Sequence, residues 1–175
     1  RRRLDSQGST RRRAEFVAGR RAVRGAIAKA CGGLPAAGDV VIETAPNGAP
    51  IAVGLDCAIS ITHSDCRAMA LARRGGRPIG LDLCEHDDAK RIRRVVARGF
   101  PDAHERESAL ANEYSLCASW SLKEAIAKAL GIGMLEGRGV ERITIRGIDP
   151  PVATVSGDER RLHLAVFVPA RGVLA

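Results

Sequence analysis

The spacing of apolar residues predicts two principal helices in this chain. Over residues 13–30, Phe16, Val23 and Ile27 recur on one face with helical spacing. Residues 120–131 read Trp-Ser-Leu-Lys-Glu-Ala-Ile-Ala-Lys-Ala-Leu-Gly, a segment without proline that is rich in alanine and leucine. Its last residue is a glycine, which suits a helix C-cap. We therefore expect a long helix to end at this glycine.

The rest of the apolar pattern predicts two more helices and a set of short strands. The helices are expected over residues 86–98 and 102–116. The strands are expected at 40–43, 68–72, 78–84, 140–145, 152–155 and 162–168. This order lacks a regular strand–helix–strand repeat, so it indicates an α+β fold.

Length and composition narrow the class of protein. A chain of 175 residues can hold one domain or two small fused halves, and its 45% apolar content is ordinary for a globular protein. It has no apolar run of about 18 residues, so no membrane span is expected. The five cysteines are odd in number and widely spaced. This usage favours reduced thiols in a cytoplasmic protein.

The net charge of +8 is concentrated at the start of the chain. Residues 1–24 hold nine arginines against two acids, a local charge of +7. Residues 1–12 have almost no apolar content, and we expect them to form a disordered basic arm. Such an arm can bind nucleic acid, but the sequence shows no reading-helix motif and no set of stacking aromatics. Phosphate-rich coenzymes and acidic proteins would satisfy the same charge.

Two acids stand out as candidates for chemistry. Glu124 and Lys128 lie one turn apart on the same face of the 120–131 helix as Trp120. An exposed pair of this kind is worth only about 0.2–0.5 kcal/mol, which is the plain structural interpretation. Asp82 lies within the apolar strand 78–84, where an unpaired carboxylate would be costly. A metal ion or a basic partner would explain its position.

Three stretches, taken in order, resemble the 4′-phosphopantetheinyl transferases. They are Ile-Ser-Ile-Thr-His-Ser at 59–64, Pro-Ile-Gly-Leu-Asp-Leu-Cys-Glu at 78–85, and the Trp-x-x-Lys-Glu-Ala helix at 120–131. They are most similar to the larger, surfactin-synthetase-activating type and its Trp-Lys-Glu-Ala subgroup. The resemblance extends from Arg13 to Phe167.

The resemblance implies an arrangement of two halves related by a pseudo-two-fold axis. Each half is expected to be a small, mostly antiparallel sheet packed with helices, with the active site in the cleft between the halves. The corresponding boundaries here are 13–77 for the N-terminal half and 78–175 for the C-terminal half, after the arm at 1–12. We expect a monomer.

The resemblance also assigns roles to residues of the C-terminal half. Asp82 and Glu124 are expected to bind Mg²⁺, and they lie 42 residues apart in the sequence. Lys128 is expected to face the pyrophosphate of coenzyme A and to steady the leaving group. Lys123 would hold the coenzyme or orient Glu124. The general base is open between Glu124 and a metal-bound water, and the role of Glu85 is open as well.

In the N-terminal half, the resemblance points to contacts with coenzyme A. Arg20 and Arg24 are expected to bind its 3′-phosphate, a task for which the guanidinium fork is suited. Thr62 and His63 are expected to bind the coenzyme's phosphates. Ala49 stands where the family has a coenzyme-binding lysine, so that contact is missing.

The implied reaction transfers 4′-phosphopantetheine from coenzyme A to a serine of an apo acyl carrier protein, a peptidyl carrier protein or a polyketide-synthase carrier domain. It releases adenosine 3′,5′-bisphosphate and depends on Mg²⁺. Ala49, and Cys84 where many relatives have a further acid, leave an alternative open: a relative that binds coenzyme A or carrier without activity. A basic nucleic-acid-binding module is the remaining alternative, and we do not expect a nucleic-acid or membrane partner.

Overall fold

The computed structural model describes residues 10–33, 40–64, 67–134, 139–158, 161–167 and 173–175. The chain divides into two compact units, Arg1–Ile79 and Gly80–Ala175, which we describe separately. Residues 1–9 of the expected basic arm lie outside the described residues. Residues 10–12 of that arm are helical, because the first helix begins at Thr10.

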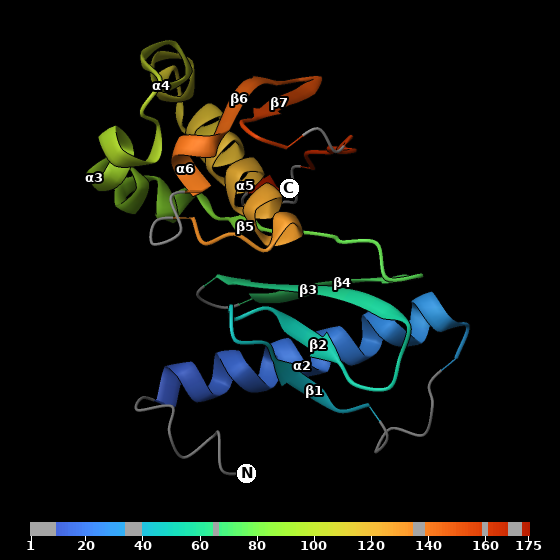
Figure 1. The fold of residues 1–175 in the computed structure, drawn as a ribbon. Coiled ribbons are helices and arrows are strands. Elements are labelled where there is room, and N and C mark those ends of the chain that lie inside the picture. The colour runs from blue at the N-terminus through green and yellow to red at the C-terminus, as the bar shows by residue number, and fades with distance from the viewer. Residues whose placement is uncertain (1–9, 34–39, 65–66, 135–138, 159–160, 168–172) are drawn as a thin grey trace. The chain divides into compact units, whose positions relative to one another are not determined.

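Unit 1 is one long helix packed against β-hairpins. Its elements are α2 (Thr10–Cys31), β1 (Ile42–Thr44), β2 (Pro50–Ala52), β3 (Cys57–Ser64) and β4 (Arg67–Arg74). β1 pairs with β2 and β3 with β4, both antiparallel. α2 lies along the β3–β4 hairpin (Figure 1). The predicted apolar face supplies the core, since Val23 and Ile27 are fully buried.

Unit 2 is built around a central helix. Its elements are β5 (Leu83–Cys84), η1 (His86–Asp88), α3 (Ala89–Gly99), α4 (Ala103–Leu110), α5 (Glu113–Leu130), α6 (Gly139–Arg142), β6 (Ile143–Ile148), β7 (Pro151–Val155) and β8 (Val173–Leu174). β5 pairs with β8 and β6 with β7, again antiparallel. Helix α5 contacts α3, α4, β5, β6 and β8 (Figure 1).

The ends of α5 follow from its sequence. The side chain of Asn112 caps the first turn by accepting a hydrogen bond from Ser115 N at 2.8 Å. This cap splits the helix expected over 102–116 into α4 and the start of α5. The predicted C-cap is confirmed, because Gly131 has the left-handed conformation with φ of 70°.

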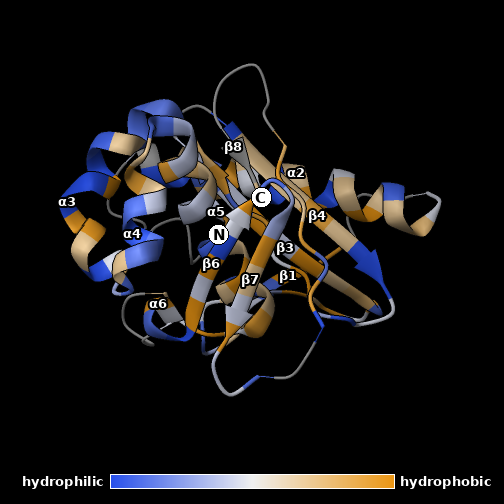
Figure 2. Ribbon diagram, turned by 90° about the horizontal axis from the view of Figure 1, so that it is seen from above, coloured by the Kyte–Doolittle hydropathy of each residue, from blue (hydrophilic) through white to orange (hydrophobic). Residues whose placement is uncertain are grey.

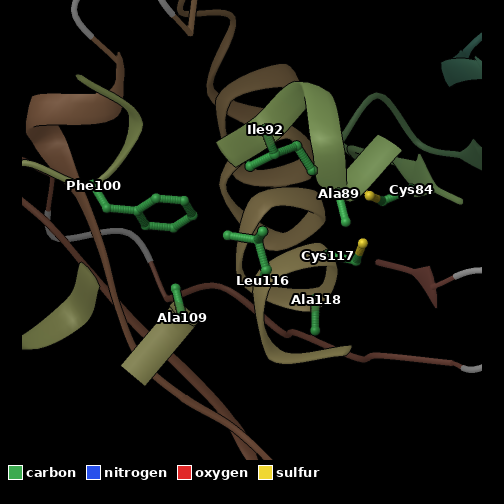
Figure 3. Close-up of a cluster of buried hydrophobic side chains, with 8 residues drawn as sticks. All are labelled: Cys84, Ala89, Ile92, Phe100, Ala109, Leu116, Cys117 and Ala118. Carbon is green, nitrogen blue, oxygen red and sulfur yellow. The ribbon is translucent and has the colours of Figure 1, made fainter. Parts of the chain in front are cut away.

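Two apolar clusters pack along α5. Leu116 and Cys117 belong to the first, together with Phe100 and Ile92 of neighbouring segments (Figure 3). Leu122 and Ile126 belong to the second, against α6 and β6. Helix α5 is therefore buried along most of its length, and side chains that it holds have fixed surroundings.

Several predicted strands are shorter than expected. Of the strand expected at 78–84, only Leu83–Cys84 is a strand, because the backbone at Gly80 lies against α5 instead. Residues 139–142 form the helix α6 before β6 begins at Ile143. Among residues 161–167, only Phe167 makes a β-bridge.

The α+β class with small antiparallel sheets is confirmed. Figure 2 shows how hydrophilic and hydrophobic residues alternate around the helices of the protein, most clearly around α3. In the described ranges, none of the helices has the length and apolar character needed to span a bilayer. The pseudo-two-fold relation, the interdomain cleft and the boundary between the halves stay predictions.

Candidate active site

Asp82 is held by two side chains of α5. Its Oδ2 accepts a hydrogen bond from Ser121 Oγ at 3.0 Å, and its Oδ1 lies 2.7 Å from Lys128 Nζ. Lys128 Nζ also donates to the carbonyl of Leu81 at 3.0 Å. The buried carboxylate therefore has a basic partner, which is one of the two explanations that the sequence offered for an acid in this apolar segment.

Backbone contacts place Asp82 beside α5. A β-carbon at Gly80 would overlap the carbonyl oxygen of Ala125, so only glycine allows this close approach. On the other side, Asp82 N donates to Ala175 O at 2.6 Å and Ala175 N donates to Asp82 O at 2.9 Å. The segment is thus fixed between α5 and the end of β8.

Glu124 lies in the same electrostatic environment as Asp82. Burial raises its pKa from the ordinary 4.5, the charge of Asp82 raises it further, and Lys128 opposes the shift. Lys128 lies 2.7 Å from Asp82 and one turn after Glu124 on α5, so two carboxylates that are 42 residues apart in the sequence lie near the same lysine. Two neighbouring carboxylates favour a bound cation, because a cation removes the cost of ionising both.

Lys123 points into the core rather than toward Asp82. It is completely buried, and its Nζ lies 3.0 Å from Glu105 Oε2. It also donates to the carbonyls of Gly99 and Val140 at 3.0 and 3.2 Å. Burial lowers the pKa of Lys123 and raises that of Glu105, and the ion pair opposes both shifts.

The pair of Lys123 and Glu105 connects several elements. Glu105 Oε1 accepts a hydrogen bond from Ile145 N at 2.6 Å, which links α4 to β6. The ring of Phe100 lies 5.0 Å from Lys123 Nζ, and Trp120 packs edge-on against that ring at 6.2 Å. Lys123, although it belongs to the motif, therefore serves the internal structure of unit 2.

Unit 1 has a cavity of about 390 Å³ beside α2. Arg12, Glu15, Phe16 and Arg20 line it from the helix, and His63 lines it from β3. The Arg20 guanidinium carbon lies 4.3 Å from the centre of the Phe16 ring. Two arginines and a histidine at one cavity can bind an anion.

The comparisons with known families cover most of the chain. A family model described as the 4′-phosphopantetheinyl transferase superfamily matches residues 78–169. A second, the 4′-phosphopantetheinyl transferase N-terminal domain, matches residues 2–73. The chain belongs to the 4′-phosphopantetheinyl transferase superfamily. A search of curated proteins gave no match.

Membership in the 4′-phosphopantetheinyl transferases makes the chain an enzyme of that class. Each family match includes one group of predicted site residues. Asp82, Glu124 and Lys128 come together in unit 2, and Arg20 and His63 line the cavity of unit 1. Arg24 and Thr62 do not line that cavity, because Arg24 is exposed elsewhere on α2 and Thr62 alternates with His63 on β3.

Of the two roles expected for Lys123, coenzyme binding and orientation of Glu124, the first does not fit its burial. A side chain without exposed surface, whose amine is engaged by a carboxylate and two carbonyls, is in no position to hold a coenzyme. Its ion pair with Glu105 explains why an amine occurs there. We assign Lys123 a structural role in unit 2.

The donor set of this transferase fits Mg²⁺. The carboxylates of Asp82 and Glu124 are the hard oxygen ligands that this ion prefers. Among the described residues, no group of three or more His, Cys, Asp or Glu side chains gathers to hold a metal. Two carboxylates, with further oxygens from phosphate and water, match the way Mg²⁺ is usually bound in phosphate-processing enzymes.

Sequence reasoning missed three residues near the candidate sites. Ser121 donates to Asp82, Glu105 pairs with Lys123, and Arg12 lines the unit 1 cavity. Helical spacing could have suggested Ser121, which lies seven residues, about two turns, before Lys128 on the same face of α5. The contact between Glu105 and Lys123 joins two different helices, so no local sequence pattern predicts it.

Proposed function

We propose that this enzyme transfers the 4′-phosphopantetheine group of coenzyme A to a serine hydroxyl of an apo acyl or peptidyl carrier protein in a Mg²⁺-dependent reaction. The serine oxygen bonds to the β-phosphorus, the pyrophosphate bond breaks, and adenosine 3′,5′-bisphosphate leaves. We place the enzyme in the surfactin-synthetase-activating type because of its Trp-x-x-Lys-Glu-Ala helix.

The observation that carries this proposal is the meeting of Asp82, Glu124 and Lys128 within unit 2. Lys128 lies 2.7 Å from Asp82, and the charge of Asp82 raises the pKa of Glu124. Phosphoryl transfer depends chiefly on positioning and on neutralising phosphate charge. Two carboxylates that can hold a cation, with an amine beside them, supply those requirements.

Each of these side chains has a separate task in the reaction. When bound by Asp82 and Glu124, Mg²⁺ neutralises pyrophosphate oxygens. Lys128 donates to a phosphate oxygen and steadies the negative charge of the leaving bisphosphate. The serine proton goes either to Glu124 or to a water molecule bound beside it.

The cavity of unit 1 supports binding of the coenzyme's phosphates. Arg20 and His63 line it, and Arg12 adds a third basic group. A guanidinium holds phosphate oxygens through two parallel hydrogen bonds, so Arg20 is the candidate for the 3′-phosphate. Arg24 and Thr62 stay proposed contacts outside this cavity.

Helix α3 supports an acidic carrier protein as the acceptor. Its buried face holds Ile92, while its exposed face carries five basic residues: Lys90, Arg91, Arg93, Arg94 and Arg98. Such a face attracts an acidic partner and speeds its association. Replacing Lys90 and Arg94 by glutamate should raise the KM for carrier and leave the KM for coenzyme A unchanged.

The test of the reaction uses Glu124→Gln. Purified protein is incubated with coenzyme A, Mg²⁺ and an apo carrier protein, and the carrier's intact mass is measured. Wild-type protein should add one phosphopantetheine, whereas Glu124→Gln should lose nearly all transfer, because the amide has neither the charge nor the basicity of the carboxylate. Its circular dichroism spectrum should match wild type.

The outcomes separate the alternatives. Wild-type protein that binds coenzyme A but leaves the carrier mass unchanged would be an inactive relative. Transfer at the wild-type rate by Glu124→Gln would remove Glu124 from the site and leave the reaction standing.

A further inference from the structure

Lys128 contacts one oxygen of the Asp82 carboxylate. Its Nζ lies 2.7 Å from Oδ1, and its second hydrogen bond, to Leu81 O at 3.0 Å, ties it to the same backbone segment. It also lies one turn after Glu124 on the same face of α5. One ammonium group is therefore near both carboxylates.

Ser121 contacts the opposite oxygen of the same carboxylate. Its hydroxyl is fully buried and donates to Oδ2 at 3.0 Å. Ser121 and Lys128 are seven residues apart, two turns along one face of α5. Helix α5 thus donates hydrogen bonds to both carboxylate oxygens of Asp82, one from a neutral hydroxyl and one from a charged amine.

We propose that Lys128 is a resident counter-ion of the metal site, which a binding metal displaces from Asp82 Oδ1, and that Ser121 is a positioning residue that keeps Asp82 in place during this exchange. The inference rests on the proposed function, because it takes Asp82 and Glu124 as the Mg²⁺ ligands. It adds a coupling that the reaction alone does not require. Metal binding and release of Lys128 toward the phosphates become a single event.

The two contacts differ in how easily they can open. The Lys128 side chain is 32% exposed, so its amine can move into solvent or onto a phosphate without leaving a buried charge. Ser121 has no exposed surface and a short side chain, so its hydroxyl stays where the helix puts it. A cation can therefore replace Lys128 on Oδ1, while Oδ2 keeps its hydrogen bond.

The coupling predicts opposite effects of the two residues on metal affinity in the absence of coenzyme. Removing the positive charge with Lys128→Met should tighten Mg²⁺ binding about fivefold to tenfold, since the metal no longer competes with the amine. Removing the hydroxyl with Ser121→Ala should weaken it by a similar factor, because Asp82 loses its fixed orientation. Lys128 is also a proposed phosphate ligand, so Lys128→Met should lose transfer while its metal affinity rises.

The experiment is a titration of each purified full chain with Mg²⁺ by isothermal calorimetry, without coenzyme A. Mn²⁺ followed by electron paramagnetic resonance gives a second measurement of the same affinities. Lys128→Arg keeps the charge and should bind metal like wild type, whereas Ser121→Thr keeps the hydroxyl and should recover the Ser121→Ala loss. Lys29→Met, an exposed charge loss on α2, and Ser119→Ala, a buried serine of α5, are matched controls.

Metal affinity in Lys128→Met that equals or falls below wild type overturns the counter-ion role. Unchanged affinity in Ser121→Ala, or an equal loss in Ser119→Ala, overturns the positioning role. Circular dichroism and thermal midpoints verify folding, and Ser121→Thr decides the question if Ser121→Ala does not fold. Wild-type protein that modifies carrier while these effects are absent refutes this inference alone, whereas failure of transfer and of Mg²⁺ binding by wild type refutes the proposed function.

Discussion

Helix α5 carries two lysine–carboxylate pairs with different surroundings. Lys123 and Glu105 are both within the core, with exposed side-chain fractions of 0% and 2%. Lys128 and Asp82 are at 32% and 12%. The N···O separations are similar, 3.0 and 2.7 Å, so distance does not distinguish the pairs. The depth of burial does distinguish them, because only the second pair includes a lysine whose side chain is partly exposed.

The comparison explains how one short motif provides both structure and chemistry. We call Lys123 and Glu105 the inner pair, and Lys128 and Asp82 the outer pair. Leaving a buried charge without its partner costs much free energy, so the inner pair fixes α4, β6 and the end of α3 around α5. The outer pair can open at a smaller cost, because solvent, metal or phosphate can replace either partner. A site for changing ligands thus lies on a helix that is itself firmly held.

The largest effect should come from breaking the inner pair. Lys123→Met should destabilise unit 2 by about 3–5 kcal/mol, because it leaves Glu105 buried and unpaired. Lys128→Met removes a partly exposed partner and should cost at most about 1 kcal/mol. Urea denaturation followed by circular dichroism gives both values.

A double variant sharpens this result. Lys123→Met combined with Glu105→Gln removes both charges and keeps an amide oxygen for the hydrogen bond from Ile145 N. Most of the lost stability should return, because no buried charge is left unpaired. The two pairs would be equivalent, contrary to our comparison, if Lys123→Met cost no more than Lys128→Met.

The next largest effect should come from moving the outer pair without changing it. Gly80→Ala places a β-carbon on the Ala125 carbonyl and should push Asp82 away from α5. Transfer should fall about 100-fold, as expected when a catalytic group is misplaced by about 1 Å, and the free energy of unfolding should fall by about 1–3 kcal/mol. Rates come from the carrier mass assay.

Gly25→Ala is the matched control for this substitution. Gly25 lies in α2, and a β-carbon there would have no atom within 4 Å. The change should stabilise α2 by about 0.5–1 kcal/mol and leave the transfer rate unaltered. Wild-type transfer by Gly80→Ala would mean that the position of Asp82 does not depend on this contact.

These contacts also show what the sequence could and could not predict. The 120–131 helix, its glycine cap and the proximity of Glu124 and Lys128 follow from local spacing and capping chemistry. The burial of Lys123 does not, because it depends on Glu105 reaching it from another helix. The family resemblance left that lysine either holding the coenzyme or orienting Glu124, and only packing in three dimensions reveals its ion pair with Glu105.

The same distinction applies to the strands. The segment 78–84 has an apolar pattern typical of a strand, yet most of it lies against α5 through Gly80. Helix α6 (Gly139–Arg142) takes up the first three residues of the alternating pattern at 140–145, where tertiary contacts outweigh a weak strand preference. Short apolar runs are the least decisive signals in a sequence of this size.

In unit 1, a partly exposed cation should behave like the outer pair. Arg20→Ala should weaken coenzyme A binding about tenfold or more and leave stability nearly unchanged, because a charged hydrogen bond is lost at a cavity rather than in a core. Dephospho-coenzyme A, which lacks the 3′-phosphate, should bind wild type and Arg20→Ala alike. Calorimetry measures both ligands.

Arg24→Ala tests whether the cavity decides this role. Arg24 lies one turn further along α2 but does not line the cavity, so its loss should matter less than that of Arg20. Equal losses for the two ligands in Arg20→Ala would show that this arginine does not recognise the 3′-phosphate.

The smallest effect concerns an acid that caps a helix. Asp102 Oδ1 accepts a hydrogen bond from Glu105 N at 2.7 Å, and this bond lowers the pKa of Asp102 below its ordinary 3.8. A carboxyl with a lowered pKa stabilises the fold fully above the ordinary value and loses that contribution as the pH falls through the folded value. Asp102→Asn should therefore lower the melting temperature slightly at neutral pH, and the difference should vanish in acid. A difference that persists in acid would exclude the charge as its cause.

The pairing of Asp82 with Ala175 has a consequence for the order in which the enzyme is made. Asp82 leaves the ribosome 93 residues before its backbone partner does. At ordinary rates of synthesis, this interval is roughly 5–19 s. Helix α5 is complete once Leu130 has been made, but until Ala175 follows, the segment that bears Asp82 lacks its backbone partner. A nascent chain can therefore complete unit 1 long before its acidic centre takes final form, so newly made protein should acquire activity only after translation has passed Ala175.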